Sequence, residues 1–237
     1  MSAANGANGA NDVTGANAAM DADVATAMNG AEAVVNVGWY MERGVINKRR
    51  LPKAYRHPRL DAEIRRDRAR IESQLIAAAR RAGVPVPVVY DVHGQDIVME
   101  RIEGPALRDR LTLVDEAEAS RLLAELGNLV ARLHEVGITH GDLTTSNVLV
   151  TNVLVANGLA TNGLVANGLC LIDFGLGQIT EEVETRGVDL HIVEEALQAT
   201  DARADALWSA FEGGYQWSGR VPVLRRLHEI RERGRYR

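Results

Sequence analysis

Two segments of the chain place their apolar residues at helical spacing. Residues 61–82 carry one stripe, formed by Ile64, Ile71, Leu75 and Ala79. Residues 115–136 carry another, formed by Leu122, Leu126, Leu129 and Leu133. Because residues three or four positions apart share one face of an α-helix, both segments are predicted to be amphipathic helices.

Shorter runs rich in β-branched residues predict strands, and three more helical patterns follow towards the C-terminus. The predicted strands are 31–37, 44–48, 88–92, 96–100, 148–151 and 169–172, and the further helices are 187–199, 203–217 and 221–233. Since the strands come first and the helices afterwards, the predicted fold class is α+β, with a sheet-rich first lobe and a helical second lobe.

Two tracts of biased composition interrupt these patterns. Residues 1–29 are mostly Ala, Asn and Gly, which bury too little surface to offset ordering, so this segment is predicted to be disordered. Residues 151–168 repeat an Asn every five positions, a period that fits neither helix nor strand, and we interpret them as an expanded hairpin loop. The predicted first lobe is residues 30–103, which include the inter-lobe hinge. The predicted second lobe is residues 104–237, which contain the repeat and end in a basic tail.

The bulk composition is that of a globular protein, with 46% hydrophobic and 25% charged residues among 237. Cys170 is the sole cysteine, so no disulfide can form within the chain, and it is expected in the core. No apolar run approaches the length of a membrane span. We therefore expect a cytoplasmic protein that has no contact with a membrane.

The net charge of −5 conceals two basic segments. Residues 42–70 carry eleven Lys or Arg against four Asp or Glu, and residues 220–237 carry seven Arg against two Glu. Such segregation has two interpretations, solvated helix faces or a polyanionic partner. The tail residues Arg233, Arg235, Tyr236 and Arg237 suit contacts to RNA phosphates and bases, or to the anionic site of a protein partner.

The residues with the clearest chemistry are His140-Gly141-Asp142-Leu143-Thr144-Thr145-Ser146-Asn147, before one predicted strand, and Asp173-Phe174-Gly175, after the next. A hairpin between them brings Asn147 and Asp173 to one cleft, where their oxygens suit Mg²⁺ that bridges phosphates. Asp142 is then free to orient or deprotonate the attacking hydroxyl or water, as phosphoryl transfer requires. The alternative is that Asp142 and Asp173 merely cap turns.

In the first lobe, Lys48 ends a predicted strand and Glu72 lies in the helix that follows. A lysine that holds the α- and β-phosphates and is fixed by a helix glutamate completes a kinase constellation. Residues Gly30, Ala31, Glu32 and Ala33 take the place of the usual phosphate loop but are poorer in glycine. The backbone groups of Glu100 and Ile102, at the hinge, are predicted to read adenine.

Several strings together resemble the PRPK-type atypical kinase of the KEOPS (EKC) complex, in its archaeal form. They are Gly-Ala-Glu-Ala at 30, Pro-Lys-Ala-Tyr-Arg-His-Pro at 52, Val-Met-Glu at 98, His-Gly-Asp-Leu-Thr-Thr-Ser-Asn at 140, Ile-Asp-Phe-Gly-Leu at 172 and Arg-Gly-Arg-Tyr-Arg at 233. The resemblance selects Lys48 among the basic residues of its segment. It implies a two-lobed protein-kinase-like fold with a minimal second lobe and no extended activation segment.

By the same resemblance, the chain is expected to be a serine/threonine kinase or ATPase that uses ATP and Mg²⁺. Asp142 is the implied catalytic base, and Asn147 and Asp173 are the implied metal ligands. The implied partners are the KEOPS transferase subunit, a small KEOPS regulatory subunit and tRNA, whose N6-threonylcarbamoyladenosine modification the complex supports.

Two alternatives remain at this point. One is a small-molecule phosphotransferase of the aminoglycoside or choline kinase type, which also uses His-Gly-Asp-Leu followed by Asn but carries a larger helical substrate lobe. The other is a non-catalytic kinase-fold scaffold. Asp189 is predicted to cap backbone N–H groups around His140, from a helix that begins near Val188. His134 and the aromatic residues Trp208, Phe211, Tyr215 and Trp217 are expected to be structural.

Overall fold

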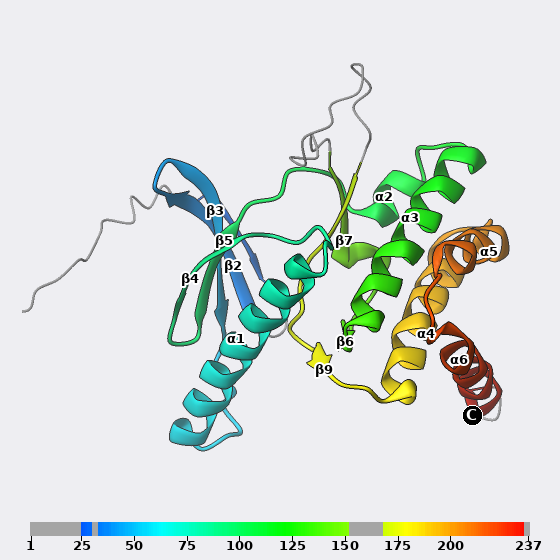
Figure 1. Cartoon of the computed structure of the whole chain (residues 1–237). Coiled ribbons are helices and arrows are strands. Elements are labelled where there is room, and N and C mark those ends of the chain that lie inside the picture. Colours follow the sequence, from blue (N-terminus) through cyan, green and yellow to red (C-terminus); the bar gives the residue numbers. More distant parts are fainter. Residues whose placement is uncertain (1–24, 30–32, 152–167, 235–237) are drawn as a thin grey trace, which may run out of the picture.

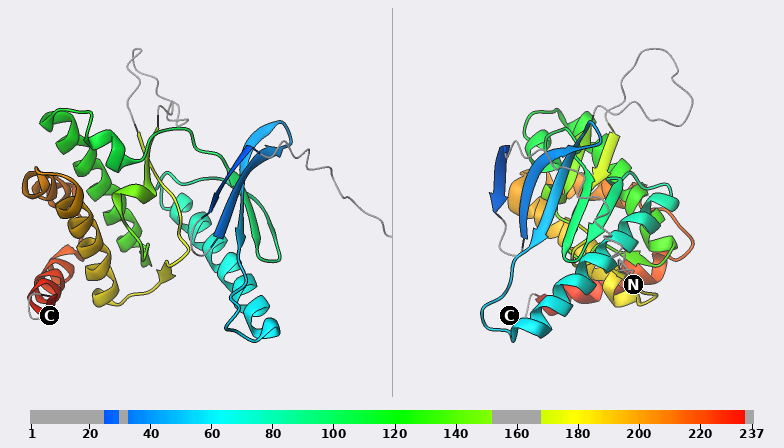
Figure 2. Two further views of the ribbon diagram at one scale, coloured as in Figure 1. Left: turned by 180° about the vertical axis from the view of Figure 1, so that it is seen from behind. Right: turned by 90° about the vertical axis from the view of Figure 1, so that its left-hand side faces the viewer.

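The structure is a computed structural model that describes residues 25–29, 33–151 and 168–234. A β-sheet with one long helix lies on one side of the molecule and a group of helices on the other (Figure 1). The same division is visible from behind (Figure 2, left). The predicted α+β arrangement of a sheet-rich first lobe and a helical second lobe is therefore confirmed.

The first lobe contains a five-stranded antiparallel sheet of order β1-β2-β3-β5-β4. Its strands are β1 (Ala25–Asn29), β2 (Ala33–Tyr40), β3 (Arg43–Arg50), β4 (Val89–His93) and β5 (Asp96–Glu100). The strand β1 corrects the prediction that all of residues 1–29 are disordered. Pairing with β2 supplies backbone hydrogen bonds that composition does not reveal.

The helix α1 (Pro58–Arg81) lies along this sheet and joins the two lobes. Its Ala69 packs on Ile97 and Met99 of β5, while Leu75 and Ala79 pack into the core of the second lobe. Ile71 is 42% exposed, so its expected place on the buried face was wrong. The buried face is rotated towards Glu72, a residue that a count of apolar positions treats as external.

The second lobe is built from α2 (Leu107–Leu111), α3 (Glu116–Glu135), α4 (Val183–Thr200), α5 (Ala204–Gly214) and α6 (Arg220–Gly234). Asp115 caps α3 by accepting the Glu118 N–H at 2.9 Å. The helices α3 and α5 approach closely at Gly127 and Gly214. A Cβ at Gly127 would lie 2.1 Å from the Phe211 carbonyl oxygen, and one at Gly214 would lie 1.9 Å from that of Ala124. Only glycine permits this contact.

Two small antiparallel pairs belong to the second lobe, and the motif residues lie directly beside their strands. The strand β6 (Ile138–Thr139) pairs with β9 (Gln178–Ile179), and β7 (Val148–Thr151) pairs with β8 (Gly168–Leu171). A single 3₁₀ turn, η1 (Thr145–Asn147), leads into β7. The predicted hairpin around the repeat is confirmed for its strands, whose ends pair Thr151 with Gly168. Residues 152–167 lie outside the described part of the chain.

Several predicted boundaries were wrong. The helix α1 begins at Pro58, α4 begins at Val183 and α5 ends at Gly214, while β8 ends before Ile172. The short elements α2, β6 and β9 were not predicted, because a few residues cannot display a period.

The expected core residues of the second lobe are buried, with Phe211, Tyr215 and His134 at 0% exposure. Trp208 and Trp217 pack partly buried against this core. Cys170 is also buried, and its burial raises the pKa of the thiol to about 12, so the thiol is inert at neutral pH. Among the described helices, none has an apolar stretch long enough to cross a lipid bilayer.

Candidate active site

A buried ion-pair network links the two lobes. The Lys48 ammonium lies 2.7 Å from Oε1 of Glu72 and 2.7 Å from Oδ1 of Asp173. Lys48 is 8% exposed and Glu72 is 1% exposed, so water competes little for the contact between them, whereas the Asp173 side chain is 47% exposed and its contact with Lys48 lies at the edge of the network. The structure thus brings together three residues that stand 24 and 125 positions apart.

Arg50 belongs to the same network, although the sequence reasoning did not single it out. Its Nη2 donates to Oε2 of Glu72 at 2.5 Å, and the side chain is 5% exposed. Lys48 and Arg50 stand two positions apart in β3, and alternate residues of a strand point to the same face. That spacing was the signal that would have identified Arg50 as a second partner of Glu72.

Asp173 occupies an unusual backbone conformation, with φ of +64°. A non-glycine residue adopts this left-handed region rarely, and such positions gather at functional sites. Its Oδ1 also accepts the Gly175 N–H at 3.2 Å. Burial alone would raise the pKa of the Asp173 carboxyl, but the Lys48 ammonium and these hydrogen bonds outweigh it and hold the pKa below its usual value. The group is therefore an anion at neutral pH.

The loop from Gly141 to Asn147 is closed by its own side chains. The Asn147 Nδ2 group donates to the backbone oxygen of Asp142 at 2.8 Å and to Oδ2 of Asp142 at 3.0 Å. Both residues are partly exposed. The Ile172 N–H donates to the backbone oxygen of Asn147 at 3.0 Å. The β7–β8 hairpin therefore places Asp173 beside this loop.

His140 connects the loop to the Asp173 segment. Its Nε2 lies 3.0 Å from the Ile172 oxygen, and its Nδ1 lies 3.3 Å from the Asp142 nitrogen. These partners assign the proton to Nε2, which donates to Ile172, while Nδ1 accepts the Asp142 N–H. Burial lowers the pKa of His140, against the opposing charges of Asp189 and Asp173, and so favours this neutral form.

Asp189 fixes the start of this loop through hydrogen bonds to its backbone. Its carboxylate accepts the His140 N–H at 2.6 Å and the Gly141 N–H at 2.7 Å, which confirms the predicted cap. Gly141 has a φ of +79°, and a Cβ there would lie 2.2 Å from the Leu176 oxygen, so this turn requires glycine. The helix that carries Asp189 begins at Val183, earlier than predicted.

The same carboxylate also touches His134, whose Nε2 lies 3.3 Å from Oδ2 of Asp189. On its other side, Nδ1 of His134 lies 2.7 Å from the Tyr215 hydroxyl. Burial lowers the pKa of His134, although Asp189 acts in the opposite direction. A neutral ring that donates to Asp189 and accepts from Tyr215 satisfies all three groups.

The remaining candidate residues divide by position. The Glu100 N–H donates to the Val88 oxygen at 2.8 Å and Oε2 of Glu100 accepts the Val88 N–H at 3.0 Å, so of its two backbone groups the N–H is already used. Ile102 follows the end of β5 and is partly exposed.

Ala33 is buried in β2, while Gly30, Ala31 and Glu32 lie outside the described residues. Arg233 lies in α6, 3.5 Å from Glu184, and Arg235, Tyr236 and Arg237 lie outside the described residues.

The donor set suits a magnesium ion that arrives with its nucleotide. In the described part of the chain, no three His, Cys, Asp or Glu side chains gather as a self-sufficient metal site. One carboxylate and one amide, here Asp173 and Asn147, are the kind of partial ligand set that Mg²⁺ uses when phosphates and water complete its shell. The residues therefore fit Mg-ATP better than a resident metal ion.

Comparisons with known proteins agree with this geometry. Residues 41–156 match the model of the RIO domain, and residues 145–170 match a GLTT repeat in six copies. Two solved structures share the fold at 16% identity. They are the Rio2 kinase complex with ADP, Mg²⁺ and phosphoaspartate from Chaetomium thermophilum (TM-score 0.61, 91% of this chain and 73% of that one) and WaaP bound to acyl carrier protein (TM-score 0.58, 87% of each). The fold is therefore that of a protein-kinase-like protein.

Curated relatives define the family more narrowly. A probable serine/threonine-protein kinase BUD32 homolog from Archaeoglobus fulgidus is 40% identical over 87% of this chain and 94% of its own length. A probable bifunctional tRNA threonylcarbamoyladenosine biosynthesis protein from Methanocorpusculum labreanum is 44% identical over 89% of this chain. The chain spans only 36% of that relative and 35% of a like-named one from Methanosarcina mazei. This chain belongs to the BUD32 family of atypical kinases, as the resemblance predicted.

Proposed function

We propose that this protein binds Mg-ATP between its two lobes and transfers or hydrolyses the γ-phosphoryl group in support of threonylcarbamoyladenosine formation on tRNA. The network of Lys48, Glu72 and Asp173, next to the Asp142–Asn147 pair, is the observation that carries the proposal. Bound Mg-ATP would supply the phosphoryl group and the metal charge that offsets its oxygens. The residues of the chain supply position, orientation and a proton acceptor.

In the first lobe, Lys48 is the group for the α- and β-phosphates. Its ammonium is held from behind by Glu72, which Arg50 holds in turn at 2.5 Å. Such a chain of buried partners fixes the position of the ammonium before the nucleotide binds. The Glu100 carbonyl and the Ile102 N–H are the backbone groups proposed for adenine, and Gly30, Ala31, Glu32 and Ala33 are proposed to lie over the phosphates.

In the second lobe, Asp173 and Asn147 are the proposed metal ligands and Asp142 is the proposed base. Because Asn147 donates to Asp142 through Nδ2, its Oδ1 is the atom available to a cation. Oδ2 of Asp142 is held by that amide, which orients the carboxylate that receives the proton of the attacking hydroxyl or water. Asp189 and His140 position this loop through its backbone.

The tRNA context rests on the names of the relatives. The bifunctional relatives are nearly three times as long as the region that this chain matches, so their second function, which we take to be the transferase, lies largely outside that region. We propose the KEOPS transferase subunit and a small regulatory KEOPS subunit as partners. The tail residues Arg233, Arg235, Tyr236 and Arg237 are proposed to contact tRNA or the transferase.

The decisive experiment measures ATP hydrolysis by the purified protein alone, with the transferase subunit, with tRNA and with both. The proposal expects Mg²⁺-dependent turnover that the partner and tRNA increase. If neither wild-type protein nor any of these mixtures turned over ATP while nucleotide still bound, the chain would instead be a kinase-fold scaffold.

A further inference from the structure

A small hollow, open to solvent, lies beside the end of β3 and the first turns of α1, and its lining includes none of the proposed catalytic residues of the second lobe. It is lined by Arg50, Leu51, Lys53, Arg56, Ile64, Arg65 and Arg68. Five of these side chains are cationic and the other two are apolar. A hollow with this lining concentrates positive potential, because its walls shield the charges from solvent.

One donor inside this lining lacks an acceptor. Arg50 is 5% exposed and uses Nη2 to hold Glu72, yet its Nε is buried and has no hydrogen-bond partner in the described part of the chain. A guanidinium remains charged at any physiological pH, and a buried donor without an acceptor is costly. An anion in the pocket that accepts from this Nε would remove that cost.

The Asp61 carboxylate contacts several of the residues that line the pocket. Asp61 is 2% exposed and accepts the Arg65 Nε at 2.7 Å, while Nη1 of Arg56 lies 3.6 Å away. Asp61 also accepts the Lys53 N–H at 3.3 Å. One buried carboxylate thus holds two guanidinium groups and the loop between β3 and α1, and the pocket is preformed rather than assembled on binding.

An exposed aromatic ring lies beside Arg56, one of the residues that line the pocket. Tyr55 is 78% exposed, and the Arg56 guanidinium lies over its ring at 5.2 Å from the centroid. An exposed aromatic ring beside phosphate-binding cations is the arrangement with which proteins bind unpaired nucleotides, since the ring stacks on a base while the cations hold the backbone. A phosphorylated peptide would need the cations but would give the ring no planar partner.

We propose that this pocket binds a backbone phosphate of RNA, with Arg50 and Arg56 as donors and Tyr55 stacked on the adjacent base. The proposal rests on the tRNA-linked function above and assigns that substrate a place on the first lobe. It also connects RNA to the nucleotide site, because Arg50 holds Glu72 and Glu72 holds Lys48. Binding at one site then alters affinity at the other by the same factor in both directions.

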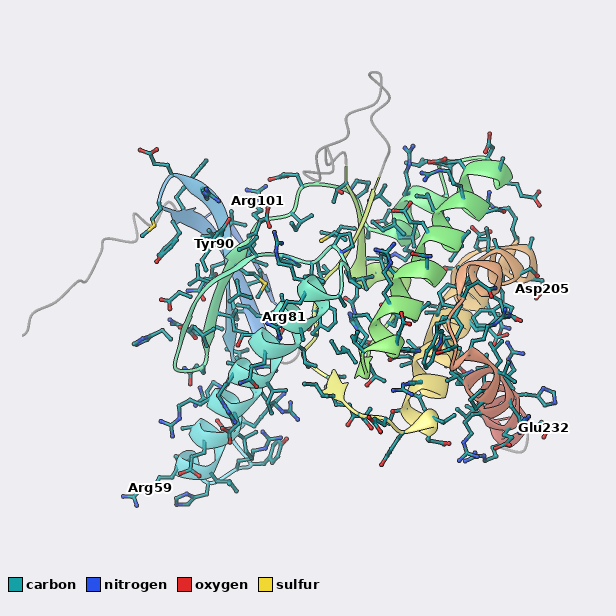
Figure 3. All side chains as sticks on the ribbon, viewed as in Figure 1. Arg59, Arg81, Tyr90, Arg101, Asp205 and Glu232 are labelled. Carbon is teal, nitrogen blue, oxygen red and sulfur yellow. The ribbon has the colours of Figure 1, made fainter. Side chains whose placement is uncertain are left out.

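The test measures binding of a labelled tRNA transcript by fluorescence anisotropy, over a series of salt concentrations and without ATP. The variants are Tyr55→Ala and Arg56→Gln, and the matched control is Arg81→Gln. Arg81 is exposed in the last turn of the same helix (Figure 3). A helix of 24 residues spans roughly 36 Å, so the control removes the same charge far from the pocket.

Tyr55→Ala is expected to weaken tRNA binding at least about fivefold, the lower bound for losing one stacked base. Arg56→Gln is expected to weaken binding and to lower the slope of log affinity against log salt by about 0.7–0.9, the value for one phosphate contact. Arg81→Gln is expected to leave both quantities unchanged. Thermal melting shows that each variant is folded.

Two outcomes would overturn the proposal. Equal losses in all three variants would mean diffuse attraction to the basic helix without a pocket. Arg56-dependent binding of a phosphoserine peptide, with unaltered tRNA affinity, would assign the pocket to a protein partner. Because the measurement requires no turnover, a failure of the proposed ATPase function would leave this result standing, and the reverse also holds.

Discussion

Arg50 and Glu72 form a buried pair in which Nη2 of the arginine donates to Oε2 of the carboxylate at 2.5 Å. The pair leaves Oε1 of Glu72 to Lys48. The position of the proposed phosphate-binding lysine is therefore set by a residue that stands behind it in the same strand, and this arrangement can be tested by its effect on stability.

We expect Arg50→Met to lower the free energy of unfolding by an amount near the lower end of the ~3–5 kcal/mol found when one partner of a buried pair is removed, because Lys48 still contacts Glu72. Arg49→Met is the control, since Arg49 pairs with Asp96 at 2.6 Å but its side chain is 56% exposed. That variant should lose about 1 kcal/mol or less. Urea unfolding gives both values, and equal losses would contradict the structural role of Arg50.

Asp142→Ala is expected to reduce ATP turnover by about 10²–10⁴-fold while nucleotide binding and folding persist, because the carboxylate acts on the attacking oxygen. Asp173→Ala is instead expected to lose the Mg²⁺-dependent part of nucleotide affinity, because it removes a proposed metal ligand. Turnover assays and nucleotide titrations with and without Mg²⁺ separate the two effects. Full turnover in Asp142→Ala would show that another group is the base.

Acidification is expected to destabilise the protein through its buried histidines. Burial lowers the pKa of both His134 and His140 below 6.5 in the folded state. As pH falls through about 6.5, the unfolded chain therefore binds protons that the folded chain refuses, and each histidine removes up to about 1.4 kcal/mol per pH unit. The contribution of these neutral histidines to the free energy of unfolding is fully present above this range and is lost progressively below it.

The measurement is urea unfolding at pH 7.5, 6.5 and 5.5. His134→Gln should flatten the pH dependence, because glutamine does not titrate, whereas His228→Gln should not, since the His228 side chain is 70% exposed. An unchanged slope in His134→Gln would show that this histidine is protonated in the folded protein.

Replacing residues 152–167 by Asn-Gly is expected to leave ATP turnover nearly unchanged and to raise the melting temperature by a few degrees. Thr151 and Gly168 are already paired across the hairpin, and Asn-Gly suits a tight turn between such strands. Three halvings of loop length alter the closure entropy by roughly 2 kcal/mol in favour of the shorter loop. A sharp fall in melting temperature would show that the repeat packs on the described fold.

Removing residues 235–237 is expected to weaken tRNA binding in a salt-dependent way, since two arginines and their phosphate contacts are lost. The shorter cut is preferred to one at residue 233, because α6 continues to Gly234 and Arg233 contacts Glu184. Anisotropy with tRNA alone, without the transferase, decides the role of the tail. Unaltered affinity at low salt would assign the tail to the protein partner.

Much of the site could be predicted from local strings, because the chemistry depends on residue types at short range. The loop from His140 to Asn147 and the triplet at Asp173 flank two apolar strands, and this order alone predicted a hairpin that joins them. The cap by Asp189 was predicted from the pattern of kinase folds, in which an Asp in a helix after the Asp-Phe-Gly triplet caps the catalytic loop, together with a suitable helix position. The pairing of Lys48 with Glu72 required a resemblance to select the lysine.

Tertiary structure decided what depends on burial and on contacts between distant segments. The residues of α1 that face the interior could not be found by counting apolar positions, because the buried face centres on Glu72, whose charge is compensated by β3. The strand β1 exists because β2 offers it hydrogen bonds, which the composition of residues 25–29 does not express. The basic segment 42–70 was compatible with solvated helix faces or with a polyanionic partner, and only the fold gathers Arg50, Arg56 and Arg65 around one pocket. Sequence determined which chemical groups are present, and packing determined which of them lose water and so act strongly on one another.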